Sequence, residues 1–117
     1  MISLGQEWLL TVEKASPQAL RDPSALQSLM EALVSRLELH IAAAPLWHVF
    51  PEPGGITGLY LLSESHAAIH TFPEFQAATL SVYSCRSRAD FPFETLLADF
   101  FPGAQVSVQR IDRKAFS

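Results

Sequence analysis

The stretch LLSESHAAIHTFPEF, residues 61–75, places polar side chains that can do chemistry inside an otherwise apolar run. Glu64 and Ser65 are adjacent, and histidines follow at positions 66 and 70. A serine hydroxyl becomes a useful nucleophile when a base such as histidine activates it. The pattern therefore indicates nucleophilic or acid–base chemistry, although a Glu-Ser pair at a strand end is also typical of a turn that bonds to its own backbone.

Cys85 is the one cysteine of the chain, so it forms no internal disulfide and is either a small buried hydrophobe or a reactive thiol. In an extended segment alternate residues share a face, which groups Cys85 with Ser81 and Tyr83. His66 and His70 share a face for the same reason. Their spacing of four residues would suit a metal pair on a helix, but the flanking sequence is typical of a strand and lacks the glutamate of H-E-x-x-H. We therefore expect no metal site.

The composition limits the class of protein. A chain of 117 residues can build one core but not two, so we expect one domain over residues 1–117. Hydrophobic residues make up 49% and charged residues 17%, and a subunit interface could cover the surplus apolar surface. A net charge of −4 with scattered basic residues does not favour a nucleic-acid partner. No apolar run approaches the roughly 20 residues that span a bilayer, and the N-terminus lacks a basic signal region, so we expect a cytoplasmic protein without a membrane partner.

Two helices are expected to position these residues. Asp22 before Pro23 is typical of a helix N-cap, and apolar residues then recur at helical spacing over about residues 23–39. Asp90 is expected to cap a second helix at roughly 91–101.

Strand-like runs fill most of the remaining chain, at residues 7–13, 45–50, 59–65, 67–72, 77–85 and 105–112. The resulting order is β-α-β-β-β-β-α-β. Because the strands are mostly consecutive, this order predicts an α+β fold, a two-layer sandwich whose antiparallel sheet carries both helices on one face.

Several motifs taken together carry a more specific signal: HVF, GGITG, ESH, IHTFPE and VYSC. With their offsets from Ser65 to His70 and Cys85, they resemble the prokaryotic S-adenosylmethionine decarboxylase proenzymes, small pyruvoyl-dependent enzymes of spermidine synthesis. The strong match covers about residues 48–85, and a weaker likeness extends over most of the chain.

In that family the chain cuts itself at the Glu-Ser bond. The resemblance implies that the Ser65 hydroxyl attacks the Glu64 carbonyl, that the peptide becomes an ester, and that Ser65 ends as a pyruvoyl group. The products would be a β chain of residues 1–64 and an α chain of residues 65–117. Such a step needs a polarised carbonyl and a base for the Ser65 α-proton.

The family also implies the catalytic roles of three further residues. By resemblance His70 is the base for self-cleavage, and the hydroxyl of Thr57 assists formation of the ester. The pyruvoyl ketone would condense with the amine of the substrate and accept the electrons released with CO2. Cys85 would then protonate the resulting carbanion, which a thiol can do because it is mostly protonated at neutral pH.

The substrate site is carried over in the same way. Phe50 resembles the aromatic residue that stacks on the adenine of S-adenosylmethionine and favours its positive sulfonium, and Glu74 resembles the carboxylate that holds the ribose hydroxyls. In the small prokaryotic enzymes the site forms between two protomers. The resemblance therefore implies a homodimer in which Ser65 and Cys85 of one protomer face Phe50, Thr57, His70 and Glu74 of the other.

The chain departs from the family pattern at four places. It opens LGQE instead of LGRH, its loop FPEPGGITG is one residue longer, Phe72 replaces a Trp, and Arg86 follows the cysteine where a Gly is usual. A neighbouring Arg would favour the thiolate and weaken Cys85 as a proton donor.

Three hypotheses follow from these residues. The first is a pyruvoyl-dependent S-adenosylmethionine decarboxylase. The second is an arginine or ornithine decarboxylase on the same fold with the same cofactor, for which the altered LGQE and Arg86 argue. The third is a dimeric relative that does not cleave and acts as a binding module.

Overall fold

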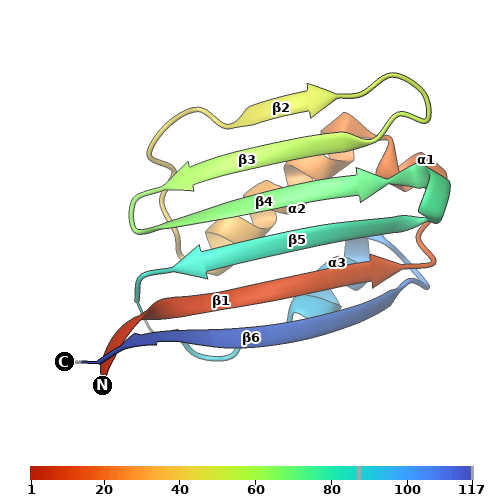
Figure 1. The fold of residues 1–117 in the computed structure, drawn as a ribbon. Helices are drawn as coiled ribbons and strands as arrows, with labels where there is room; N and C mark the ends of the chain where they lie inside the picture. The colour runs from red at the N-terminus through yellow and green to blue at the C-terminus, as the bar shows by residue number, and fades with distance from the viewer. Residues whose placement is uncertain (87, 117) are drawn as a thin grey trace.

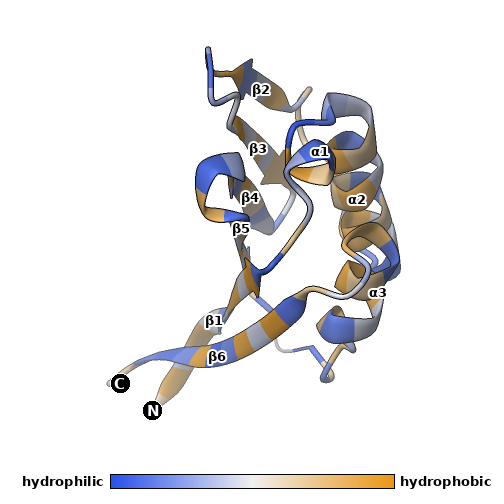
Figure 2. Ribbon diagram, turned by 90° about the vertical axis from the view of Figure 1, so that its right-hand side faces the viewer, coloured by the Kyte–Doolittle hydropathy of each residue, from blue (hydrophilic) through white to orange (hydrophobic). Residues whose placement is uncertain are grey.

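The computed structural model describes residues 1–86 and 88–116. In chain order its elements are β1 (Ile2–Glu13), α1 (Pro17–Leu20), α2 (Pro23–Arg36), β2 (Leu46–Val49), β3 (Ile56–Leu62), β4 (Ser65–Phe72), the 3-10 turn η1 (Pro73–Phe75), β5 (Ala77–Ser84), α3 (Phe93–Phe100) and β6 (Gln105–Ala115). The strands form one antiparallel sheet in the order β2-β3-β4-β5-β1-β6 (Figure 1). The helices lie together on one face of the sheet (Figure 2). The predicted two-layer α+β sandwich is confirmed.

The core lies between the sheet and the helices because strand alternation turns one set of apolar side chains toward them. On β1, Trp8, Leu10 and Val12 are buried, whereas the intervening residues are more exposed. The predicted apolar stripe of α2 packs against this face, with Leu29 and Leu33 fully buried. Each such side chain contributes about 1.5–3 kcal/mol on burial. The opposite face of the sheet, called here the open face, carries none of the helices α1, α2 and α3 (Figure 2).

The first long helix begins as predicted and ends slightly earlier. Asp22 is its N-cap, with the side-chain oxygen accepting a hydrogen bond from the amide of Ala25 at 3.1 Å. The helix stops at Arg36 rather than near residue 39, because Glu38 adopts a left-handed conformation with φ of 56°. The four-residue helix α1 lies in a segment for which no helix was predicted.

The cap predicted for the second helix is wrong. Helix α3 begins at Phe93, and Pro92 occupies its N-cap position. The carboxylate of Asp90 instead accepts a hydrogen bond from Arg110 on β6, at 2.9 Å. None of the helices in the described part of the chain is long and apolar enough to cross a membrane.

The strand predicted at residues 59–65 is shifted in the structure. Strand β3 runs from Ile56 to Leu62, and Leu62 pairs with Ser65 in the ladder. Only Ser63 and Glu64 remain for the turn, so Ser65 begins β4 rather than ending β3. The Glu64-Ser65 peptide bond therefore lies where a tight turn enters a strand.

Gly5 allows β1 to pass close to the end of β5. Its φ is +130°, and a Cβ atom there would lie 2.3 Å from the carbonyl oxygen of Ser84. Only glycine fits such an approach. The G of the LGQE segment thus places the start of β1 beside residues 84–85, next to one of the candidate sites.

Candidate active site

The seven candidate site residues fall into two groups at opposite ends of the central strands. The first group, called here the cavity end, comprises Phe50, Thr57, His70 and Glu74. The second group, called here the turn end, comprises Glu64, Ser65 and Cys85. Strands β3, β4 and β5 run between the two groups (Figure 1).

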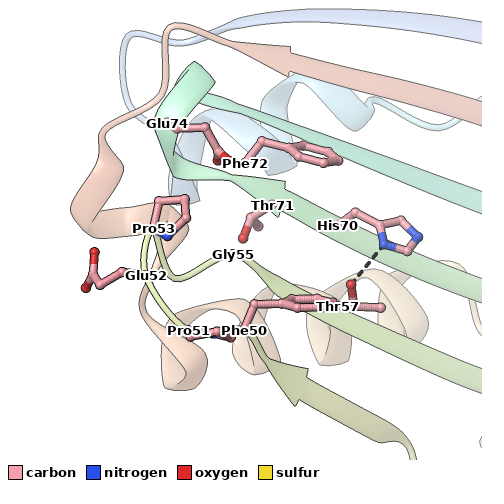
Figure 3. Close-up of a pocket in the computed structure, with 10 residues that line it drawn as sticks. All are labelled: Phe50, Pro51, Glu52, Pro53, Gly55, Thr57, His70, Thr71, Phe72 and Glu74. Atoms are coloured by element: carbon pink, nitrogen blue, oxygen red, sulfur yellow. Dashed lines mark hydrogen bonds between the residues drawn. The ribbon is translucent and has the colours of Figure 1, made fainter.

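The cavity end is a hollow of about 440 Å³ to which all four residues of its group contribute. The β3–β4 ladder pairs Thr57 directly with His70, and Thr57 Oγ1 lies 3.0 Å from His70 Nδ1, within hydrogen-bond distance (Figure 3). Because the bond uses Nδ1, the ring orientation is fixed and Nε2 has no protein partner among the described residues. A histidine held in this way can accept or donate a proton at Nε2.

Aromatic and acidic side chains complete the cavity end. Phe50 is about half exposed, at 49%, and Phe72 also lines the hollow. The carboxylate of Glu74, which is on η1, points toward the other lining residues, whereas that of Glu52 points away from them (Figure 3). Flat apolar faces beside one carboxylate suit a ligand that has an aromatic or cationic part and hydroxyl or amine donors.

The turn end contains a buried hydroxyl with no partner. Ser65 is 8% exposed, and its Oγ forms no hydrogen bond within the described residues. Its neighbour across the ladder is Ser84, which is fully buried on the same face. Buried hydroxyls are usually satisfied, so an unpartnered one calls for a functional explanation. A hydroxyl free of competing bonds is available as a nucleophile.

The carbonyl beside that hydroxyl is held by a backbone donor. The amide of Cys85 donates a hydrogen bond to the carbonyl oxygen of Glu64, with an N–O distance of 2.8 Å. A backbone N–H aimed at a carbonyl oxygen stabilises the negative charge that develops when a nucleophile attacks the carbon. The side chain of Cys85 is exposed, and its thiol is free.

Arg86, which follows Cys85 in the chain, binds the carboxylate of Glu64 in the turn. Its Nη2 donates to Glu64 Oε1 at 2.8 Å, and its Nε contacts the second carboxylate oxygen. The hydrogen bond and the negative charge of Glu64 raise the pKa of Arg86 above its ordinary value. The guanidinium predicted to act on the thiol is thus paired with a carboxylate.

The sequence analysis assigned no role to Arg88 and Gln6, which hold the segment that follows β5. Arg88 donates from Nε to Ser84 Oγ at 3.2 Å and from Nη1 to the carbonyl of Leu37 at 3.0 Å. The amide of Arg88 also donates to the buried side chain of Gln6 at 2.9 Å. The LGQE departure marked the position of Gln6, but its contact with residue 88 depends on the fold.

The two ends cannot react with each other inside one chain. Ser65 and His70 are five residues apart on β4, which corresponds to about 17 Å along an extended strand. The odd separation also places them on opposite faces, with Ser65 buried under the helices and His70 exposed on the open face. Within one chain, Ser65 and His70 are therefore too far apart to contact each other.

No group of three His, Cys, Asp or Glu side chains in residues 1–86 and 88–116 is arranged to hold a metal ion.

Comparison with protein families gives a match over residues 6–114 to the family described as S-adenosylmethionine decarboxylase. The S-adenosylmethionine decarboxylase proenzyme of Moorella thermoacetica is 32% identical over 117 residues, which cover 97% of this chain and 90% of that protein. The arginine decarboxylase proenzyme of Aeropyrum pernix is 36% identical over 75 residues, which cover 62% of this chain and 56% of that protein. The chain thus spans little more than half of the Aeropyrum protein.

Among solved structures, the adenosylmethionine decarboxylase of Aquifex aeolicus superposes with a TM-score of 0.81, over 100% of this chain and 96% of that one. The sequences are 23% identical, so this likeness concerns the fold.

Proposed function

The chain belongs to the S-adenosylmethionine decarboxylase family, and from this premise we propose that it is a pyruvoyl-dependent decarboxylase that makes its cofactor from its own Ser65. One observation carries the proposal. The buried, unpartnered Oγ of Ser65 belongs to the residue that follows the Glu64 carbonyl, and that carbonyl already accepts a hydrogen bond from the amide of Cys85.

Self-cleavage follows from this arrangement in balanced steps. Ser65 Oγ attacks the Glu64 carbonyl carbon, the peptide C–N bond breaks, and the hydroxyl proton passes to the freed nitrogen, which leaves an ester. Loss of the Ser65 α-proton then breaks the ester bond to Cβ, so that Glu64 leaves as a carboxylate. Water replaces the nitrogen of the remaining dehydroalanine and releases ammonia. The single domain of residues 1–117 would thereby become chains 1–64 and 65–117.

The residues of the turn end fit a pyruvoyl group. The position is buried, it is not engaged by other side chains, and it has the exposed thiol of Cys85 on the neighbouring segment. When present, the group supplies a ketone that takes up the substrate amine and the electrons left by CO2. Cys85 holds the proton that returns to the substrate carbon.

A homodimer with shared sites would join the two ends. A two-fold axis running across the strands would bring the turn end of one copy over the cavity end of its partner. The open face is supported as the contact by three apolar residues on it that are 70%, 47% and 61% exposed, namely Leu46, Leu59 and Leu61. In this assembly His70 of one copy removes the α-proton from Ser65 of the other, and Thr57 orients the imidazole and assists ester formation.

S-adenosylmethionine is the substrate that the cavity end supports best. Phe50 would stack on the adenine and stabilise the sulfonium by about 0.5–2 kcal/mol, and Glu74 would accept hydrogen bonds from the ribose hydroxyls. Arginine is the second candidate, because the Aeropyrum relative bears that name; ornithine belongs to the same alternative. We further propose that the enzyme acts in the cytoplasm, without nucleic-acid or membrane partners.

Intact-mass analysis followed by CO2 release from S-adenosylmethionine, arginine and ornithine tests the proposal. We expect two fragments, the second without a free α-amine, and turnover of S-adenosylmethionine above the other two compounds. A single full-length species after long incubation at neutral pH would contradict self-cleavage and favour a dimeric binding module. Cleavage with turnover of only arginine or ornithine would keep the cofactor and change the substrate.

A further inference from the structure

Arg86 and Cys85 together hold the residue that precedes the scissile bond. Arg86 binds the Glu64 carboxylate with two nitrogens, one of them at 2.8 Å. The amide of Cys85 binds the Glu64 carbonyl, also at 2.8 Å. Two consecutive residues on the segment after β5 therefore fix both the side chain and the main chain of Glu64.

This double attachment restrains the peptide plane that must react. Ser63 and Glu64 form a two-residue turn, and the carbonyl of Glu64 must keep its oxygen on the Cys85 amide while Ser65 Oγ approaches the carbon. If the Glu64 side chain were free, the turn could rotate and lose that amide contact. A donor aimed in advance stabilises the developing oxyanion without reorganisation.

We propose that Arg86 is a positioning residue for self-cleavage, which holds Glu64 so that the scissile carbonyl stays against the amide of Cys85. The inference rests on the proposed cleavage at Glu64-Ser65. Arg86 transfers no proton: in the step it assists, Ser65 Oγ forms a bond to the Glu64 carbonyl carbon, the C–N bond breaks, and the hydroxyl proton moves to the nitrogen.

The size and the salt dependence of the effect follow from exposure. The Arg86 and Glu64 side chains are 70% and 45% exposed, so the pair contributes little to overall stability. Its loss should slow cleavage about two- to fivefold. Because salt screens exposed charges, raising the ionic strength should slow the wild-type chain and leave a chain without the pair unaffected.

Cleavage rates of freshly synthesised proenzyme test the role. Protein made by cell-free translation is quenched at intervals, and the uncleaved fraction is read by mass. The variants are Arg86→Gln, Arg86→Glu, Glu64→Arg and the exchange Glu64→Arg with Arg86→Glu. Arg110→Gln is the matched control, since it removes exposed ion pairs with Asp90 and Asp112 far from the turn.

We expect Arg86→Gln to slow cleavage and to lose the salt dependence. Arg86→Glu and Glu64→Arg should also slow cleavage, but added salt should speed these two variants because it screens the repulsion between like charges. The exchanged pair should recover most of the rate, and the control should cleave as wild type. Arg86→Lys should recover part of the rate, because an ammonium keeps the charge but not the two-nitrogen contact. If wild type cleaves and Arg86→Gln cleaves equally fast, or if the exchange is as slow as the slower single variant, the Arg86 role is wrong while self-cleavage stands. A wild-type chain that never cleaves overturns the proposed function and this role with it.

Discussion

The cavity end and the turn end use different means to hold their reactive groups. At the cavity end, His70 is fixed by Thr57, its direct neighbour in a continuous ladder of two strands. At the turn end, Glu64 and Ser65 lie where a tight turn enters β4, and the turn is held by the backbone amide of Cys85 and the side chain of Arg86 from the segment after β5. A group that only moves a proton can thus lie on rigid strands, whereas a bond that must break lies where the chain can rearrange.

Removing the nucleophile of the turn end should have the largest effect. Ser65→Ala lacks the hydroxyl that attacks Glu64, so we expect complete loss of cleavage and of decarboxylation, while the cavity end stays intact. Denaturing mass spectrometry should show only the full-length chain. Cleavage of this variant at the same bond would show that the turn end does not act as described.

Mixing two inactive variants tests whether the two ends meet across a dimer. His70→Ala should stall as an ester or as the uncleaved chain, and hydroxylamine should cleave the ester form. In a mixed dimer with Ser65→Ala, one of the two sites has both wild-type residues. Random pairing of equal amounts should therefore allow cleavage of about half of the His70→Ala chains. Light scattering should give twice the 12.9 kDa protomer mass, and no cleavage in a confirmed mixed dimer would argue against the shared site.

Loss of the Cys85 thiol should impair decarboxylation much more than self-cleavage. Cys85→Ala keeps the backbone amide that holds Glu64, so the chain should still cleave, at least in part. Decarboxylation should fall by roughly 10²–10⁴-fold because the general acid is gone. Protonation at the wrong carbon should also inactivate the enzyme by leaving alanine at position 65, which peptide mass analysis detects. Full activity on every substrate tried would make Cys85 a structural thiol.

A milder change at the cavity end should have a smaller effect. Thr57→Val keeps the shape of the side chain but removes the hydrogen bond to His70 Nδ1, so we expect cleavage to slow about tenfold. Thr57→Ser keeps the hydroxyl and should remain within about twofold of wild type. Time courses of cleavage measure both variants, and equal rates for Val and Ser would show that the hydrogen bond has no part in the reaction.

The smallest expected effect is on the pH dependence of stability, through Tyr60 on β3, a strand that runs between the two ends. Burial raises the pKa of Tyr60 on β3, and the charge of Glu31 adds to this, whereas a hydrogen bond with Trp47 opposes it. A raised pKa in the folded state stabilises the fold fully below the unfolded value of about 10, and this contribution is lost as the pH rises through the folded value. The urea midpoint of wild type should therefore fall more than that of Tyr60→Phe between about pH 8 and pH 11. Parallel curves would contradict the shift.

Sequence patterns predicted local features better than contacts between distant segments. The cap at Asp22 and the buried stripe of α2 follow from spacing alone, and the structure confirms both. The predicted limits of β3 were wrong because the turn at Ser63 and Glu64 is defined by the pairing of Leu62 with Ser65 of β4, which no local pattern encodes. The place of β1 between β5 and β6 is likewise a pairing between distant segments that no local pattern encodes.

The candidate site shows the same limit. Its residues were recognised from motifs, and their roles stay predictions, but the motifs did not show that they divide between two ends of one sheet. Arg86 was noted only as a neighbour of Cys85, whereas its carboxylate partner lies 22 positions earlier in the chain. Contacts of this kind depend on the turn and the strand register, which the sequence alone left undetermined.

The strand order has a consequence for a chain cut after Glu64. Fragment 1–64 would contribute β1, β2 and β3, and the second fragment would contribute β4, β5 and β6. Because β1 lies between β5 and β6, and β3 pairs with β4, the fragments alternate across the sheet. Neither could leave without opening three strand pairings and the shared core. Exchange of fragments between cut molecules should thus be no faster than global unfolding. Breaking the peptide bond after Glu64 should therefore shorten the lifetime of the folded protein only slightly.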